Sequence, residues 1–435
     1  MGGLLTLLRG GEWLTRERMR LVALAVLVAS IAGIGYLLAT ANGLNDYQGR
    51  PLGTDFSNVY AAGTLVLDGH PGAPFYPAQQ HAREQAIFGA DTPFYGWHYP
   101  PFFLFIAGAL SLLPYFAALA VWQGLTLGLY LVAIRAVLTA PCGSVSPKEM
   151  NAQDKAAQAG DGRGRLGDHL WLLAALAFPA VFVNLGHGHN GFLTAALIGG
   201  ALVLLDRRPT AAGILFGLIA YKPQFGLLIP LVLIATGRWR AFLAAAATVS
   251  VLVAVSTLVF GPEVWTAFVD STHFTRTVIL EDGNTGWHKI QSVFSWVRMW
   301  GGGVSVAYAV QGSVALLAAG ALVLLWRSEA AYRLKAAGLI IAALLATPYS
   351  LDYDLMALAP AIAFVAAEGW MRGFRPWEKT ALAALWLSPL LTRSVAQATL
   401  IPLAVPLMLV VYCLLLRRVA IETGLRLPGI LRHVR

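Results

Sequence analysis

The chain has 435 residues, of which 57% are hydrophobic and only 12% are charged, with a mean hydropathy of +0.65. Soluble domains carry about twice that share of charge, so the composition excludes a soluble enzyme, a disordered chain and a small disulfide-stapled domain. The net charge of +9 indicates basic cytoplasmic loops rather than a nucleic-acid partner. The sequence therefore predicts an all-α polytopic membrane protein that binds no nucleic acid.

The first apolar run covers residues 21–38 and follows a basic N-terminal segment. We interpret it as a retained transmembrane helix. Ala39-Thr40-Ala41 resembles a signal-peptidase site, so a cleaved signal peptide is the alternative.

Further apolar runs follow along the chain, and together they predict about 12 transmembrane helices, within a range of 10–13. We divide 210–236 at Pro223, because one kinked span would send most downstream basic residues to the outer face. The runs after the first are 116–139, 169–186, 191–205, 210–221, 224–236, 241–260, 303–326, 336–348, 355–367, 380–392 and 398–416.

This topology separates the charges by side. With both termini cytoplasmic, the inner face has 24 Lys or Arg and 11 Asp or Glu, whereas the outer face has 7 and 11. We expect residues 1–435 to form a single integral membrane domain with three prominent connections: a first periplasmic loop at 42–115, a flexible cytoplasmic loop at 140–168 and a second large periplasmic loop at 261–302. The run 101–113 is too short to span, so we predict an interfacial or re-entrant helix that ends at Pro114.

Polar side chains that could carry chemistry collect on the outer face, starting with Asp55 in the first loop. A carboxylate beside aromatic and hydroxyl groups can act as a general base. It can equally cap a helix that begins at Phe56. Farther along the loop, His98 and Tyr99 could contact a substrate, although a single histidine also suits an ordinary interfacial position.

The next polar segment is Asn184–Gly191, where His187, His189 and Asn190 could bind phosphate or sugar hydroxyls. His-x-His also suggests a metal site, but no carboxylate lies nearby in sequence. We predict no cofactor and no metal ligands, and a divalent-metal requirement stays open. The two cysteines, Cys142 and Cys413, have no metal-ligand spacing.

Lys222 lies between two apolar runs, where a charge is unfavourable unless it is paired, functional or snorkelled to the interface. It could neutralise a lipid phosphate, with Gln224 beside it. In the second loop, His288 and Lys289 are candidate anion ligands. Asp352 and Asp354 follow Tyr349 in a pattern typical of metal-diphosphate sites, but helix N-terminal charge preference also explains it.

Taken in order, several of these motifs resemble glycosyltransferase family 87 over roughly residues 20–415. They are Asp55-Phe56 with Tyr60-Ala61-Ala62-Gly63, Tyr99-Pro100-Pro101, Gly188-His189-Asn190-Gly191, Tyr221-Lys222-Pro223 and Asp352-Tyr353-Asp354. The resemblance implies a GT-C-like fold in the bacterial inner membrane. It also implies transfer of a hexose, often mannose, from a polyprenyl-phosphate-linked donor to a lipid or glycan acceptor at the periplasmic face.

The resemblance also implies residue roles. Asp55 would be the general base of an inverting displacement, and Lys222 would neutralise the leaving phosphate. His187, His189, Asn190, Gln224 and Lys289 would contact the donor phosphate or sugar, and the family commonly has glutamine where this chain has His189. Further site candidates are His98, Tyr99, His288, Tyr349, Asp352 and Asp354. From the residues alone, a transporter or flippase of lipid-linked sugars stays an alternative, as does a ligase or polymerase that uses diphosphate-linked donors.

Overall fold

The computed structural model describes residues 2–140 and 169–424, and nearly all of its regular structure is helical. Within these residues there are no strands, only three isolated β-bridges. The predicted all-α class is therefore confirmed. The linker predicted at 140–168 lies, apart from its first residue, outside the described residues.

The first half of the chain contains two long helices separated by a group of short ones. The helices are α1 (Gly2–Gly10), α2 (Arg16–Ala39), α3 (Thr54–Leu67), η1 (Ala73–Phe75), α4 (Pro77–Phe88), η2 (Pro101–Phe103), α5 (Leu104–Ser111), α6 (Tyr115–Thr139), α8 (Leu170–Leu176), α9 (Pro179–His187) and α10 (Gly191–Leu204).

The second half alternates short and long helices in the same way. They are α11 (Pro209–Leu218), η3 (Ile219–Tyr221), α12 (Pro223–Gly226), α13 (Leu228–Ala235), α14 (Trp239–Phe260), α15 (Glu263–Phe274), η4 (Thr275–Glu281), η5 (Trp287–Lys289), α16 (Val293–Met299), α17 (Val304–Arg327), α18 (Tyr332–Ala346), η6 (Asp352–Ala357), α19 (Leu358–Arg372), α20 (Glu378–Thr399) and α21 (Ala404–Thr423).

The apolar runs found in the sequence form helices, but the predicted count of 12 spans is not supported. Only six described helices are long and apolar enough to cross a membrane, or seven if the bent pair α8–α9 is one span. The reason is length: α10 and α18 have 14 and 15 residues, and at 1.5 Å per residue they fall short of a hydrocarbon core about 30 Å thick. The chain is a polytopic α-helical membrane protein with fewer full-length spans than predicted.

The predicted break between 210–221 and 224–236 is present. Lys222 has φ −128° and ψ 75°, outside the helical region, as expected for the residue before a proline. Pro223 then begins α12 at a position where its missing N–H is not needed. The chain therefore stops and restarts its helix at Lys222 and leaves this side chain beside a helix end.

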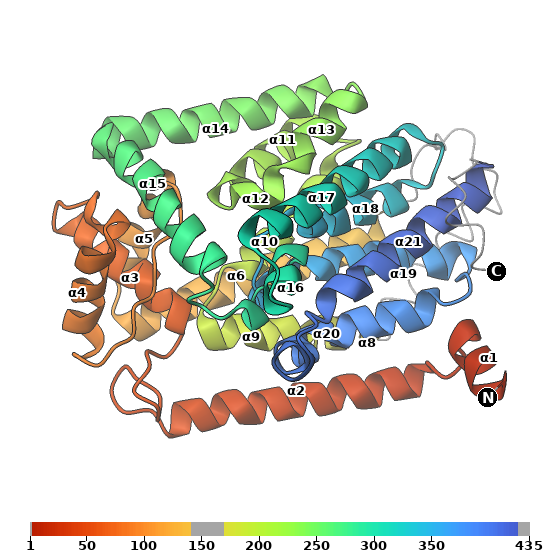
Figure 1. Cartoon of the computed structure of the whole chain (residues 1–435), viewed down its shortest axis with the longest axis horizontal. Helices are drawn as coiled ribbons and strands as arrows, with labels where there is room; N and C mark the ends of the chain where they lie inside the picture. The colour runs from red at the N-terminus through yellow and green to blue at the C-terminus, as the bar shows by residue number, and fades with distance from the viewer. Residues whose placement is uncertain (1, 141–168, 425–435) are drawn as a thin grey trace.

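The helices form an inner group and a periphery (Figure 1). α18 is buried along most of its length, and 78% of the apolar window in η6 and α19 is buried. By contrast, only 6% of the most apolar stretch of α2 and 11% of that of α14 are buried inside the protein. α14 packs closely on α11 because a Cβ at Gly213 would lie 2.3 Å from the Ala241 carbonyl oxygen, a small-residue contact typical of membrane helices.

Two ends of the molecule can be distinguished (Figure 1). The terminal end holds α1, the start of α20 and the end of α21. Here the Trp377 amide donates to the Arg9 carbonyl at 2.8 Å, and Trp13 Nε1 donates to Thr380 Oγ1 at 2.9 Å. The opposite end holds α3, α4 and α5, and we call it the loop end.

The connection 42–115 folds into short helices at the loop end. The short helix predicted at 101–113 is present as η2 and α5, and it ends at Ser111, just before Pro114. α5 packs against α3, where Ser111 Oγ donates to the Tyr60 carbonyl at 2.9 Å. The second connection, 261–302, forms α15, the π-helix η4, η5 and α16.

Candidate active site

Asp55 lies in the first turn of α3, where the helix dipole favours an acidic side chain. It does not cap a helix beginning at Phe56, because α3 begins at Thr54 and its N-cap is Gly53. Asp55 Oδ2 is buried and has no hydrogen-bond partner, and no ion pair to this carboxylate is present among the described residues. Burial raises the pKa of Asp55, an effect that the nearby His187 partly offsets. The carboxyl group is therefore placed to accept a proton.

The segment between α9 and α10 packs directly on the start of α3. Gly188 has φ +63°, and a Cβ there would lie 2.5 Å from Phe56 Cβ. Only glycine fits both the conformation and the space. His187 Nδ1 shares a hydrogen bond of 2.6 Å with Thr54 Oγ1, so this histidine and Asp55 are held at one helix terminus.

His189 is oriented differently from His187. Its ring is buried and stacks on the Tyr353 ring with centroids 3.5 Å apart, and its Nδ1 has no hydrogen-bond partner. Burial lowers the pKa of His189 well below its usual value. Asn184 fixes the stack, since its Nδ2 donates to the Tyr353 carbonyl at 2.9 Å and its Oδ1 accepts from the Gly191 amide at 2.9 Å.

Lys222 is buried and paired, so it does not snorkel to a membrane interface. Its Nζ donates to Asp354 Oδ1 at 2.5 Å. The ammonium also lies 5.5 Å from the Tyr353 ring centroid and 5.7 Å from that of Phe225. Tyr353 therefore contacts His189 on one side and faces the lysine cation on another.

Asp352 and Asp354 both lie at the start of η6, but they form ion pairs with different basic side chains, Arg393 and Lys222 respectively. Asp354 Oδ2 accepts from the Leu351 amide at 2.9 Å at the start of η6, where a negative charge was expected to be favourable. Asp352 Oδ2 forms an ion pair of 2.6 Å with Arg393 Nη2 on α20. Within residues 2–140 and 169–424, no group of three His, Cys, Asp or Glu side chains is arranged to hold a metal ion.

The second large connection reaches the same region through residues 287–291. Ile290 forms a β-bridge with Leu351, and the Gln291 amide donates to the Ser350 carbonyl at 2.6 Å. Gln291 Oε1 accepts from Thr392 Oγ1 on α20. These contacts place Lys289 and His288 beside Arg393. Burial is the main cause that lowers the pKa of both side chains, and the positive charge of Arg393 lowers it further.

Most of the predicted site residues come together. The charges of His187, Lys222, Asp352 and Asp354 all act on the Asp55 carboxylate. The remaining members of this group lie around them: His189, Asn190, Tyr99, Tyr349, His288 and Lys289.

Among the described residues, His98 and Gln224 form no hydrogen bond, ion pair or ring contact with this group. His98 Nδ1 shares a hydrogen bond of 2.8 Å with Thr275 Oγ1, beside a small cavity that is lined by Phe75, Trp97 and Phe274 among others. Burial lowers its pKa to about 4, so His98 is neutral at pH 7 and connects the two loops. Gln224 is half-buried at the start of α12, with no hydrogen bond to the group in the described part of the chain.

Sequence reasoning missed Arg393, Tyr353 and Thr54 as site residues. A signal was present for Arg393, because it is the single charged residue in the second half of α20. Tyr353 stands inside a motif that was interpreted through its two acids alone. Thr54 carried no signal, since its role depends on His187, 133 residues away.

The chain was compared with known protein families, curated proteins and solved structures. The model of glycosyltransferase family 87 matches residues 97–348, which is more than half of the chain. No curated protein and no solved structure gave a match. The matched region contains His187, His189 and Lys222, whereas Asp55 and Asp352 lie outside it. The chain therefore belongs to glycosyltransferase family 87, as its motif order indicated.

Proposed function

We propose that this glycosyltransferase moves a hexosyl group, in the first instance mannosyl, from a polyprenyl-phosphate-linked donor to a hydroxyl group of a lipid-linked or glycan acceptor. The reaction takes place at the periplasmic face of the bacterial inner membrane. Asp55 is the general base, and no further cofactor is invoked.

The observation that supports this proposal most directly is the state of Asp55. Its Oδ2 atom is buried and lacks a hydrogen-bond partner, and burial raises the pKa of the carboxyl group above its usual value. A base in that state has an open acceptor position for a substrate hydroxyl and an affinity for its proton.

The proposed step is a single displacement with inversion. Asp55 takes the proton of the acceptor hydroxyl while the hydroxyl oxygen forms a bond to the anomeric carbon of the donor. The bond between that carbon and the phosphate oxygen breaks, and its electron pair leaves with polyprenyl phosphate. The phosphate gains one negative charge, so a nearby cation such as Lys222 lowers the energy of the transition state.

Two features support a lipid-linked donor and an outer-face site. Basic residues gather at the terminal end, among them Arg9, Arg372, Arg375 and Arg418, in accord with a cytoplasmic position of that end by the positive-inside rule. The loop end carries Asp55 and lies opposite the termini. Broken and short helices flank Lys222, so a prenyl chain could stay in the bilayer while its phosphate meets the cations beside Asp55.

The test uses the purified full chain in lipid nanodiscs with a radiolabelled polyprenyl-phosphate mannose and a panel of lipid and glycan acceptors. We expect labelled product with the wild type and a fall in kcat of about 10²–10⁴-fold for Asp55→Asn, the range of a lost general base. A folded Asp55→Asn protein that transfers sugar at the wild-type rate would remove Asp55 from the mechanism.

The same assay separates the alternatives. Asp68→Asn, an exposed acid at the end of the same helix, is the matched control and should keep wild-type transfer. Strict use of a diphosphate-linked donor would contradict the monophosphate assignment. Movement of the lipid-linked sugar across proteoliposomes without any glycosyl product would favour the flippase.

A further inference from the structure

Four basic residues surround the Asp55 region, and they differ in how their charges are used. Lys222 is fully engaged, since it is buried against Asp354. Arg393 pairs with Asp352 through Nη2, while its Nε is buried without a hydrogen-bond partner. Lys289 and Arg50 form no ion pair among the described residues, and Arg50 is exposed. Arg393 and Lys289 are therefore the two partly buried basic residues of this set whose charge is not fully compensated by the described residues.

The fold holds these two residues together from different segments. Gln291 joins the 287–291 segment to Thr392 on α20 and to Ser350 before η6. Thr392 Oγ1 also accepts from the Ala404 amide at 3.2 Å, so this turn of α20 is fixed from two sides. Arg393 follows Thr392 and Lys289 precedes the bridge at Ile290, which brings both cations to one junction beside Asp352.

Burial leaves room for a ligand at this junction. The Arg393 side chain is 35% exposed, whereas Asp352 is almost completely buried at 5%. Asp352 therefore holds the guanidinium from the protein side and leaves its other face open. Two neighbouring cations with one acid beneath them have a net positive charge that suits a phosphate.

We propose that Arg393 and Lys289 form the subsite that binds the phosphate of a lipid-linked substrate, with Asp352 as the residue that positions Arg393. This inference rests on the proposed glycosyl transfer and adds the anion site to it. Lys222, paired with Asp354, then stabilises the charge that develops on the leaving phosphate, while Arg393 and Lys289 provide most of the affinity for the bound phosphate. The phosphate belongs either to the donor or to a phospholipid acceptor.

The first measurement is binding of polyprenyl phosphate to the full-length protein, with the matching polyprenol as the phosphate-free probe. We expect the wild type to prefer the phosphate, and Lys289→Gln and Arg393→Gln each to weaken phosphate binding about tenfold or more, as for a lost charge-assisted hydrogen bond. Polyprenol binding should not change. Arg276→Gln removes an exposed arginine of the same loop that pairs with Glu281, and this control should leave both affinities unchanged.

Two variants separate binding from folding. Lys289→Gln removes a cation that forms no ion pair among the described residues, so it leaves no paired acid behind. Asp352→Asn combined with Arg393→Gln removes a complete ion pair and should fold. Its affinity for polyprenyl phosphate should nevertheless be as low as that of Arg393→Gln alone. Arg393→Lys should recover part of the affinity, because the charge returns without the guanidinium geometry.

Steady-state transfer then assigns the phosphate to its source. A rise in KM for the donor alone, with a smaller change in kcat, places the donor phosphate at this subsite, whereas a rise in KM for a phospholipid acceptor alone places the acceptor there. Phosphate binding that depends on Lys289 and Arg393 in a protein without transferase activity would retain the subsite and refute the proposed function. The subsite would be overturned if the wild type bound polyprenyl phosphate and polyprenol equally well. It would also be overturned if Lys289→Gln and Arg393→Gln both bound polyprenyl phosphate with wild-type affinity.

Discussion

The two ends of the protein both bury acidic side chains, but they compensate for them differently. At the terminal end, Glu378 pairs with Arg418 at 2.9 Å, and Glu368 has Arg372 at 3.2 Å and Arg333 at 3.9 Å. At the loop end, Glu84 and Asp55 have no cation within ion-pair distance among the described residues. Buried charge at the terminal end is therefore closed within the protein, whereas at the loop end it is left open.

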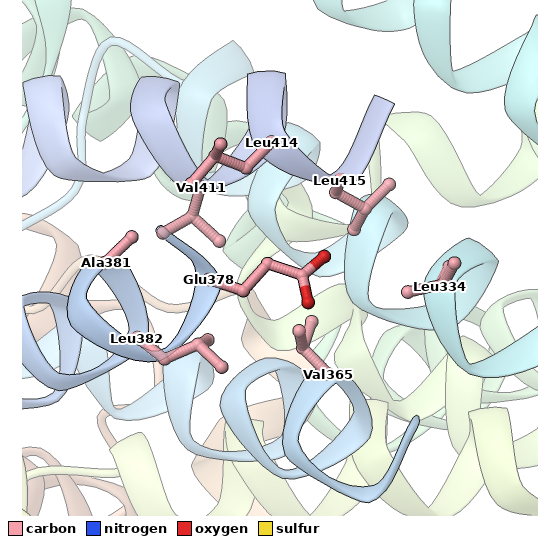
Figure 2. Close-up of a pocket in the computed structure, with 8 residues that line it drawn as sticks. All are labelled: Leu334, Val365, Glu378, Ala381, Leu382, Val411, Leu414 and Leu415. Carbon is pink, nitrogen blue, oxygen red and sulfur yellow. The ribbon is translucent and has the colours of Figure 1, made fainter. Parts of the chain in front are cut away.

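α20 contributes one residue to an ion pair at the terminal end and another to an ion pair beside the candidate site. Its first residue, Glu378, lies among apolar side chains such as Val365, Leu382 and Leu415 (Figure 2) and reaches Arg418. Fifteen residues later, and about 22 Å along the helix, Arg393 reaches Asp352 with one face exposed. The same kind of ion pair thus stabilises the fold at one end of the helix and borders the candidate site at the other.

The largest effect on stability is expected from breaking the closed pair. Arg418→Met would leave Glu378 buried without its cation, and such uncompensated charges lower the free energy of unfolding by about 3–5 kcal/mol. Thermal unfolding in detergent measures the loss, and transfer per folded molecule should stay at the wild-type level. The matched control is Arg417→Met, the neighbouring half-buried arginine on α21, which should have little effect. Equal losses in both variants would mean that the pair has no special role.

The Lys222–Asp354 pair lies beside Asp55 and is also closed, so it tests whether a closed pair next to the candidate site has a role beyond stability. Lys222→Met should destabilise the protein, and adding Asp354→Asn should restore stability, because no buried charge remains. Transfer should nevertheless stay about tenfold or more below the wild type, since a cation near the leaving phosphate is lost. The corresponding double variant at the terminal end, Arg418→Met with Glu378→Gln, should recover stability and keep wild-type transfer per folded molecule. Full transfer by the Lys222 and Asp354 double variant would make that pair purely structural.

The smallest effect concerns Glu84. Its carboxylate accepts from Gln80 Nε2 and the Tyr95 amide, and burial raises its pKa to about 8. An acid with a folded-state pKa above its unfolded value binds more protons when folded, so its contribution to stability is lost as the pH rises from about 4.5 toward 8. Glu84→Gln should flatten the decline in melting temperature between about pH 5 and pH 8. An unchanged slope would contradict this assignment.

Much of the architecture could be predicted because its signals are local. Apolar runs located the helices, and Pro223 located the break beside Lys222, since a proline acts on its own helix and on the residue before it. The number of full-length spans could not be obtained in this way. Whether a 14-residue apolar helix such as α10 crosses the bilayer depends on its neighbours rather than on its own composition.

In the candidate site, too, local signals could be predicted and long-range contacts could not. The sequence by itself identified a membrane protein with an acid, histidines and an isolated lysine on one face, because charge is unfavourable in an apolar chain and stands out there. Only the tertiary structure decided that Lys222 pairs with Asp354, that Asp352 pairs with Arg393, and that Asp55 has no ion-pair partner in the part of the chain that the structure describes. Lys222 and Asp354 are 132 residues apart, and no local periodicity specifies which distant charges meet. Pairing is set by packing, and packing determines which charges stay open to a ligand.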